Sequence, residues 1–118
     1  MAHKYDICLD IGGTKSLGVI FNENKEIIYR LKKKTKEEGD DVGNVEKVIK
    51  KVVREMIDGA GISKKEIRAI STGAPGVIDQ SKGIILFSPN LPWRDYDIRS
   101  SMEKEFGVPF FIGNDVNV

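Results

Sequence analysis

The chain has 118 residues, of which 40% are apolar and 31% are charged, and its formal net charge is +1. This length and balance suit one soluble domain, and the near-neutral charge does not favour nucleic acid as a partner. No apolar run is long enough to span a bilayer, and Met1–Lys4 lacks the apolar segment of a signal peptide. Cys8 is the only cysteine, so no internal disulfide can form. These features favour a cytoplasmic protein that binds no membrane.

Three strands are predicted in the first part of the chain, over 5–11, 16–21 and 26–31. Their short connections are typical of antiparallel neighbours. Apolar residues at spacings of three and four then predict an amphipathic helix over 42–57, and Gly59 and Gly61 lie where that helix should end.

The second part of the chain alternates strands and helices. A strand over 67–72 is followed by an irregular stretch, 73–92, with a short apolar piece at 84–87. A helix that starts at Asp97 or Ile98 and ends at Phe106 then precedes a fifth strand over 108–112. Strands that are separated by helices pair in parallel, so this order predicts one mixed sheet with helices on its faces.

A glycine-rich hairpin joins the first two strands. Gly12, Gly13, Thr14 and Lys15 match neither a P-loop, which needs glycine directly before Lys-Ser or Lys-Thr, nor a dinucleotide fingerprint, which leads into a helix. A tight turn brings backbone N–H groups close to a ligand, and Thr14 and Lys15 add a hydroxyl and a positive charge. Asp10 adds a carboxylate that would serve Mg²⁺ through water. The alternative is an ordinary hairpin.

Polar residues also follow the fourth and fifth strands. Gly76 belongs to a stretch with an unusual backbone path, and Asn90 and Trp93 offer the amide and flat apolar face that sugars bind. Asn114 and Asp115 follow the fifth strand, at the edge of an open sheet where ligands bind. A carboxylate there can accept a proton from a hydroxyl that attacks a phosphoryl group. Plain turns would explain each feature alone, but all three should converge on one sheet edge.

Three motifs, DIGGTK, GAPGVID followed by SPNLPW, and NDVN, resemble in this order those of the ROK family (repressor, open reading frame, kinase). That family belongs to the sugar kinase, Hsp70 and actin superfamily, and the resemblance covers essentially the whole chain. It implies an α/β, ribonuclease H-like (actin-like ATPase) fold. This fold has a mixed five-stranded sheet in the order 3-2-1-4-5 and helices on both faces. It also implies an ATP-dependent hexose kinase similar to bacterial glucokinases.

The resemblance assigns roles to the candidate site residues. Asp115 would be the catalytic base that accepts the proton of the sugar 6-hydroxyl, and Asp10 would organise Mg²⁺ through water. The other sugar-binding residues would be Gly76, Asn90 and Asn114. The phosphates of ATP would lie against Gly12, Gly13, Thr14 and Lys15. Two departures, Gly113 in place of the usual glutamate and Val116 in place of the usual alanine, change the packing around Asp115.

Kinases of this family have a second lobe that carries further sugar ligands, the adenosine pocket and, in many members, a Cys/His zinc site. We therefore expect residues 1–118 to form the amino-terminal lobe of a two-lobe kinase, inactive alone and prone to self-association through its exposed face. With one cysteine and one histidine in this chain, a structural zinc would belong only to the second lobe.

Two other functions compete with the kinase. One is a sugar-sensing transcriptional regulator of the same family, which would carry a DNA-binding helix-turn-helix before the DIGGT motif. The other is a non-catalytic interaction module. The early first strand and near-neutral charge favour the kinase. The resemblance of GAPG and SPNLPW favours glucose as the sugar. N-acetylglucosamine, N-acetylmannosamine and fructose remain alternative substrates, and polyphosphate remains an alternative donor.

Overall fold

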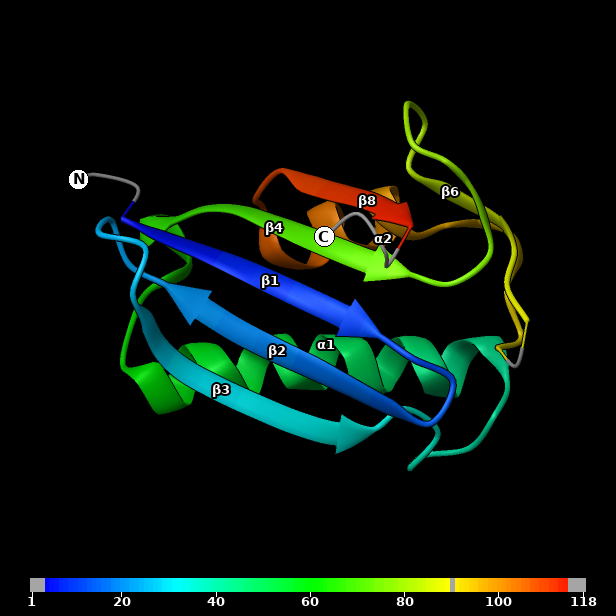
Figure 1. Cartoon of the computed structure of the whole chain (residues 1–118), viewed down its shortest axis with the longest axis horizontal. Coiled ribbons are helices and arrows are strands. Elements are labelled where there is room, and N and C mark those ends of the chain that lie inside the picture. The colour runs from blue at the N-terminus through cyan, green and yellow to red at the C-terminus, as the bar shows by residue number, and fades with distance from the viewer. Residues whose placement is uncertain (1–3, 90, 115–118) are drawn as a thin grey trace.

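The computed structural model describes residues 4–89 and 91–114, which form two β-sheets and two α-helices (Figure 1). The strands are β1 (Tyr5–Ile11), β2 (Lys15–Phe21), β3 (Ile27–Lys34), β4 (Ile67–Ala74), β5 (Val77–Asp79), β6 (Ile84–Phe87), β7 (Arg94–Asp97) and β8 (Phe110–Asn114). The helices are α1 (Val42–Ala60) and α2 (Ile98–Phe106), with a 3-10 turn at Lys64–Glu66. Neither α-helix of the described part has the length and apolarity that a membrane crossing needs.

The larger sheet has the strand order β3-β2-β1-β4-β8. Antiparallel pairs join β1 to β2 and β2 to β3, whereas β4 is parallel to both β1 and β8. The predicted mixed sheet and its order are therefore confirmed, with β8 as the fifth strand of the prediction. The smaller sheet, β5-β6-β7, is antiparallel and stands beyond the end of β4 (Figure 1).

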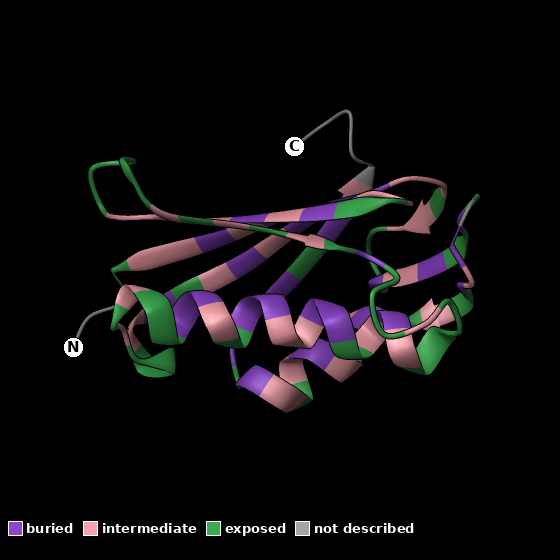
Figure 2. Cartoon of the chain, turned by 90° about the horizontal axis from the view of Figure 1, so that it is seen from below, coloured by how far each residue is buried: buried purple, intermediate pink, exposed green. Residues whose placement is uncertain are grey.

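Both helices lie on the same face of the larger sheet (Figure 2), so the prediction of helices on both faces is wrong for the described residues. The helices also contact each other, with Arg54 Nη2 of α1 2.7 Å from Glu105 Oε2 of α2. The connections β3–α1–β4 and β4–α2–β8 cross the sheet in the same direction. Such connections are nearly always right-handed, and two right-handed connections in one direction place their helices on one face.

The core lies between this face and the two helices. Buried side chains recur along α1 at spacings of three and four, from Val45 to Ile57, as the periodicity predicts. The helix starts at an N-cap, Asp41, whose side chain accepts a hydrogen bond from the Asn44 N–H, and it ends at Gly61 in the left-handed conformation (φ 70°). These ends fix where α1 can lie against β2 and β3.

A polar joint holds α1 against α2. The Glu46 carboxylate of α1 accepts a hydrogen bond from the Ser101 hydroxyl of α2, and Lys50 Nζ lies 2.7 Å from it. Burial disfavours the charged form of Glu46, but hydrogen bonds from Lys50 and Ser101 outweigh that effect and keep its pKa below the ordinary value. Burial raises the pKa of the Tyr96 hydroxyl. The joint fixes α2, and so the start of β8, relative to α1.

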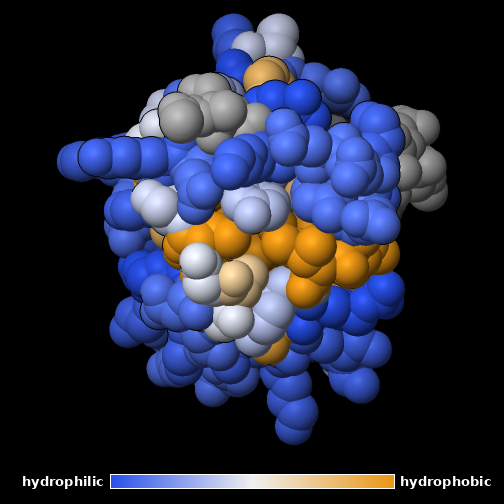
Figure 3. Space-filling view, turned by 90° about the vertical axis from the view of Figure 1, so that its left-hand side faces the viewer, coloured by the Kyte–Doolittle hydropathy of each residue, from blue (hydrophilic) through white to orange (hydrophobic). Residues whose placement is uncertain are grey.

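The other face of the larger sheet carries no helix among the described residues. Leu17, Val19 and Phe21 of β2 line a shallow apolar hollow there together with Cys8, and burial raises the pKa of the Cys8 thiol. Phe111 on β8 is 54% exposed. Seen from the end where β1 begins, hydrophobic side chains form a band between hydrophilic borders (Figure 3). Self-association through this face stays a prediction.

Candidate functional site

The carboxyl ends of β1, β4 and β8 meet at one edge of the sheet (Figure 1) because the three strands are parallel. Asp10 of β1 pairs with Gly73 of β4, which pairs with Gly113 of β8. Asp10 and Gly113 are therefore two strand spacings apart, each of roughly 4.8 Å. One residue further on, Ala74 pairs with Asn114, the last residue of β8. The glycine hairpin and the β5-β6-β7 sheet lie at this same edge, which makes it the candidate site.

The hairpin between β1 and β2 turns tightly. The Gly12 N–H donates to the Lys15 carbonyl at 3.0 Å, and a Cβ at position 12 would lie only 2.8 Å from that oxygen. No hydrogen bond of the Gly13 or Thr14 N–H group is found within residues 4–89 and 91–114. The side chains of Thr14 and Lys15 are exposed. The loop therefore presents backbone donors, a hydroxyl and an ammonium group, the groups that an anion such as phosphate binds.

The hairpin is supported from behind by Thr35, which the sequence alone does not mark. Its N–H donates to the Thr14 carbonyl at 2.9 Å, and its hydroxyl donates to the Gly12 carbonyl at 2.7 Å. Thr35 Oγ1 also lies 2.7 Å from the Ser16 hydroxyl. Thr35 is fully buried and Ser16 is 4% exposed. In the sequence, Thr35 is only a polar residue after a lysine-rich strand end, and no pattern there indicates these contacts.

Asp10 is the penultimate residue of β1, just before the hairpin, and it lies on the uncovered face of the sheet. Its carboxylate is exposed and shares no hydrogen bond or ion pair with the residues that the structure describes. Within the described ranges, no group of three or more His, Cys, Asp and Glu side chains could hold a metal ion. A single exposed carboxylate fits Mg²⁺, which keeps most of its waters and takes further ligands from substrate phosphates.

Gly76 stands at the turn from β4 into the small sheet. Its φ is +114°, and a Cβ there would lie 2.1 Å from the Phe87 carbonyl oxygen. The adjacent Pro75 carbonyl accepts a hydrogen bond from the buried Ser88 hydroxyl at 2.8 Å. The turn is thus held against the end of β6, which places the backbone around Gly76 at the candidate edge.

Comparison with known proteins decides the family. The model of the ROK family matches residues 6–118. The chain belongs to the ROK family. Over 94% of its length it is 34% identical to the glucokinase of Thermotoga maritima, and it covers 33% of that protein. Over 67% of its length it is 29% identical to the xylose repressor of Caldicellulosiruptor bescii, of which it covers 20%.

A solved structure of a ROK family glucokinase from Streptomyces griseus, in complex with glucose and AMPPNP, is also similar. It has a TM-score of 0.82 and 27% sequence identity, and the match covers 96% of this chain and 34% of that one. The actin-like fold that the resemblance predicts is thereby confirmed. This ROK family chain spans about a third of the length of the glucokinases that it matches.

The structure corrects one expectation about the site and leaves others untested. Trp93 is fully buried and stacks on Tyr96 with ring centroids 5.3 Å apart, so it is a core residue and offers no face to a sugar. Asn90 and Asp115 lie outside the described residues, and Asn114 is described only as the end of β8. Their roles, like those of the hairpin residues, stay predictions.

Proposed function

We propose that this ROK family chain is the amino-terminal lobe of a sugar kinase that transfers a phosphoryl group from ATP to the 6-hydroxyl of a hexose, with glucose as the preferred sugar. The observation that carries the proposal is the arrangement of Asp10, the glycine hairpin and the end of β8 at one edge of the sheet. This arrangement would bring a phosphate site and a carboxylate, Asp115, to the two sides of a shared site.

Each group has a stated role in this proposal. The free N–H groups of the hairpin and the Thr14 and Lys15 side chains would hold the phosphates of ATP. Asp10 would hold Mg²⁺ through water, and the ion would neutralise charge on the phosphates. Asp115 would accept the proton of the attacking hydroxyl. The backbone around Gly76, with Asn90 and Asn114, would orient the sugar.

A sugar-sensing regulator is the second candidate, because a xylose repressor is among the relatives. That match covers 67% of the chain, whereas the match to the glucokinase covers 94%. The extent of the match therefore favours the kinase. Sequence-specific DNA binding by a protein that contains this chain, without hexose phosphorylation, would favour the regulator instead.

The proposed activity can be measured in a chimera that joins residues 1–118 to the remaining two thirds of the Thermotoga maritima glucokinase, a relative 34% identical to this chain. We expect the chimera to phosphorylate glucose with ATP in a coupled assay, and residues 1–118 alone to show no turnover. N-acetylglucosamine, N-acetylmannosamine and fructose as acceptors, and polyphosphate as donor, would define specificity.

Two controls make the assay decisive. The Thermotoga segment alone should be inactive, which assigns the recovered activity to this chain. A chimera that folds cooperatively but phosphorylates none of the four sugars with either donor would contradict the proposed function.

A further inference from the structure

The hydrogen bonds of Thr35 set the direction of a peptide plane in the hairpin. The Thr35 hydroxyl proton goes to the Gly12 carbonyl, so Ser16 is the donor in its 2.7 Å bond to Thr35 Oγ1. Ser16 is buried and belongs to the helix-covered face of β2. The Gly12 carbonyl is therefore turned towards that covered face.

In a trans peptide, the carbonyl and the N–H of the next residue point in opposite directions. Because the Gly12 carbonyl points to the covered face, the Gly13 N–H points towards the uncovered face. The Asp10 side chain lies on that same face, since Ile7, Leu9 and Ile11 alternate with it and are buried on the other. The Gly13 N–H and the Asp10 carboxylate therefore point to the same side of the sheet edge.

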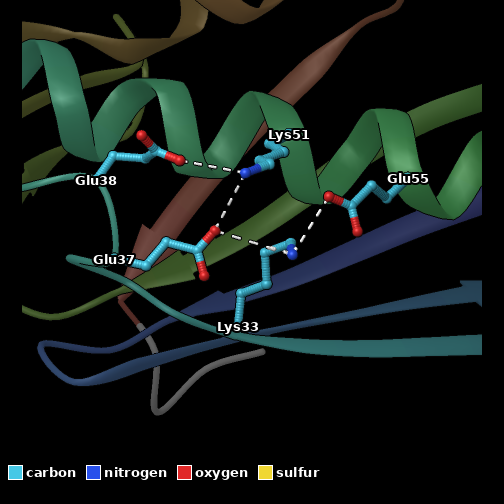
Figure 4. A network of polar contacts seen from close by, with 5 residues as sticks. All are labelled: Lys33, Glu37, Glu38, Lys51 and Glu55. Atoms are coloured by element: carbon cyan, nitrogen blue, oxygen red, sulfur yellow. Dashed lines mark hydrogen bonds and ion pairs between the residues drawn. The ribbon is translucent and has the colours of Figure 1, made fainter.

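Thr35 is itself held in place by the elements around it. The residues just after it form a turn, in which Glu37 and Glu38 lie 3.4 Å and 3.2 Å from Lys51 Nζ of α1. Lys33 of β3 lies 3.2 Å from Glu55 of α1, and it also contacts Glu37 (Figure 4). Hydrogen bonds to Glu38 and Glu37 raise the pKa of Lys51. A network of exposed pairs is more effective than an isolated pair in fixing such a segment.

We propose that Thr35 is a positioning residue for the phosphate site: its hydroxyl holds the Gly12–Gly13 peptide so that the Gly13 N–H is aimed at the polyphosphate chain of the nucleotide. This rests on the proposed function, because the nucleotide is the assumed ligand. Without the hydroxyl, the Gly12–Gly13 peptide can rotate, and the Gly13 N–H no longer points to the anion.

The test uses the ¹⁵N-labelled chimera of residues 1–118 with the Thermotoga maritima segment, which supplies a second lobe, and three variants of it. Thr35→Val removes the hydroxyl but keeps the shape and the backbone bond to Thr14, and Thr35→Ser keeps the hydroxyl. Thr72→Val is the matched control, because Thr72 is a buried threonine whose hydroxyl has no partner among the described residues. Two properties are measured: amide hydrogen exchange at Gly12, whose N–H bonds to Lys15, and the affinities for Mg²⁺–ATP and for glucose.

We expect Thr35→Val to speed exchange at Gly12 and to weaken Mg²⁺–ATP about tenfold, the effect of one net hydrogen bond, with glucose affinity unchanged. Thr35→Ser should restore both properties, and Thr72→Val should change neither. Equal losses of ATP and glucose affinity would indicate a merely structural role and overturn the proposal, as would unchanged Gly12 exchange in Thr35→Val.

The proposed function can fail independently of the positioning. If the chimera with the wild-type chain binds no Mg²⁺–ATP at millimolar concentration, the assigned ligand is wrong, and the inference about the nucleotide falls with it. Gly12 exchange then still reports whether Thr35 holds the hairpin.

Discussion

Asp115→Asn should lower the turnover of the chimeric hexose kinase by about 10²–10⁴-fold, the usual contribution of general base catalysis. The amide keeps the size of the carboxylate but cannot accept the proton of the sugar hydroxyl. The residue directly follows β8, whose last residue pairs with Ala74 at the edge that also carries the glycine hairpin. The measurement is the steady-state rate of ADP formation with saturating glucose and ATP.

The control for this substitution is Glu23→Gln, an equally conservative change in the exposed turn between β2 and β3, at the opposite end of the sheet. It should leave turnover unchanged, and both variants should unfold at the same denaturant concentration as the parent chimera. Turnover of Asp115→Asn near that of the Glu23→Gln control would reject Asp115 as the base.

Gly76→Ala should lower the free energy of unfolding of the 118-residue chain by about 3 kcal/mol, from backbone strain together with overpacking. The φ of +114° is one that side-chain-bearing residues rarely adopt. The new Cβ would also lie 2.1 Å from the Phe87 carbonyl oxygen and 2.8 Å from Ser88 Cα, both backbone atoms that cannot move alone. Urea unfolding followed by circular dichroism measures the loss.

Gly61→Ala separates these two effects. Gly61 also has a positive φ, 70°, but nothing lies within 4 Å of a Cβ placed there. It should therefore cost only the left-handed strain, about 1 kcal/mol. Equal losses for the two substitutions would show that the turn after β4 is not packed against β6 as described, and would remove the support for the position of Gly76.

Local patterns predict the elements of this fold well. The three- and four-residue spacing of apolar residues predicts α1 and its buried side. The order of strands and helices indicates which strands pair in parallel and which form hairpins. The sheet order itself comes from the resemblance to the ROK family. The strands β5 and β7 are missed because three or four mixed residues show no period.

Properties that depend on packing are not accessible in the same way. The placement of both helices on one face follows from the direction of two crossovers, which the strand pattern alone does not state. Trp93 is a large aromatic residue between loop residues, and only its stacking on Tyr96 shows that it belongs to the core. Thr35 contacts Gly12 across 23 positions of sequence, a distance at which no motif links them.

The most direct test is whether a bound nucleotide lies at the edge shared by the hairpin and the end of β8. In the ¹⁵N-labelled chimera, Mn²⁺ replaces Mg²⁺ together with ATP, and its paramagnetism broadens the amide signals close to it. We predict broadening at Asp10, Gly13 and Gly113, with no effect on Asn24 in the turn at the opposite end of the sheet. Broadening around Asn24 with sharp signals at Gly13 and Gly113 would contradict a shared site for phosphate and sugar.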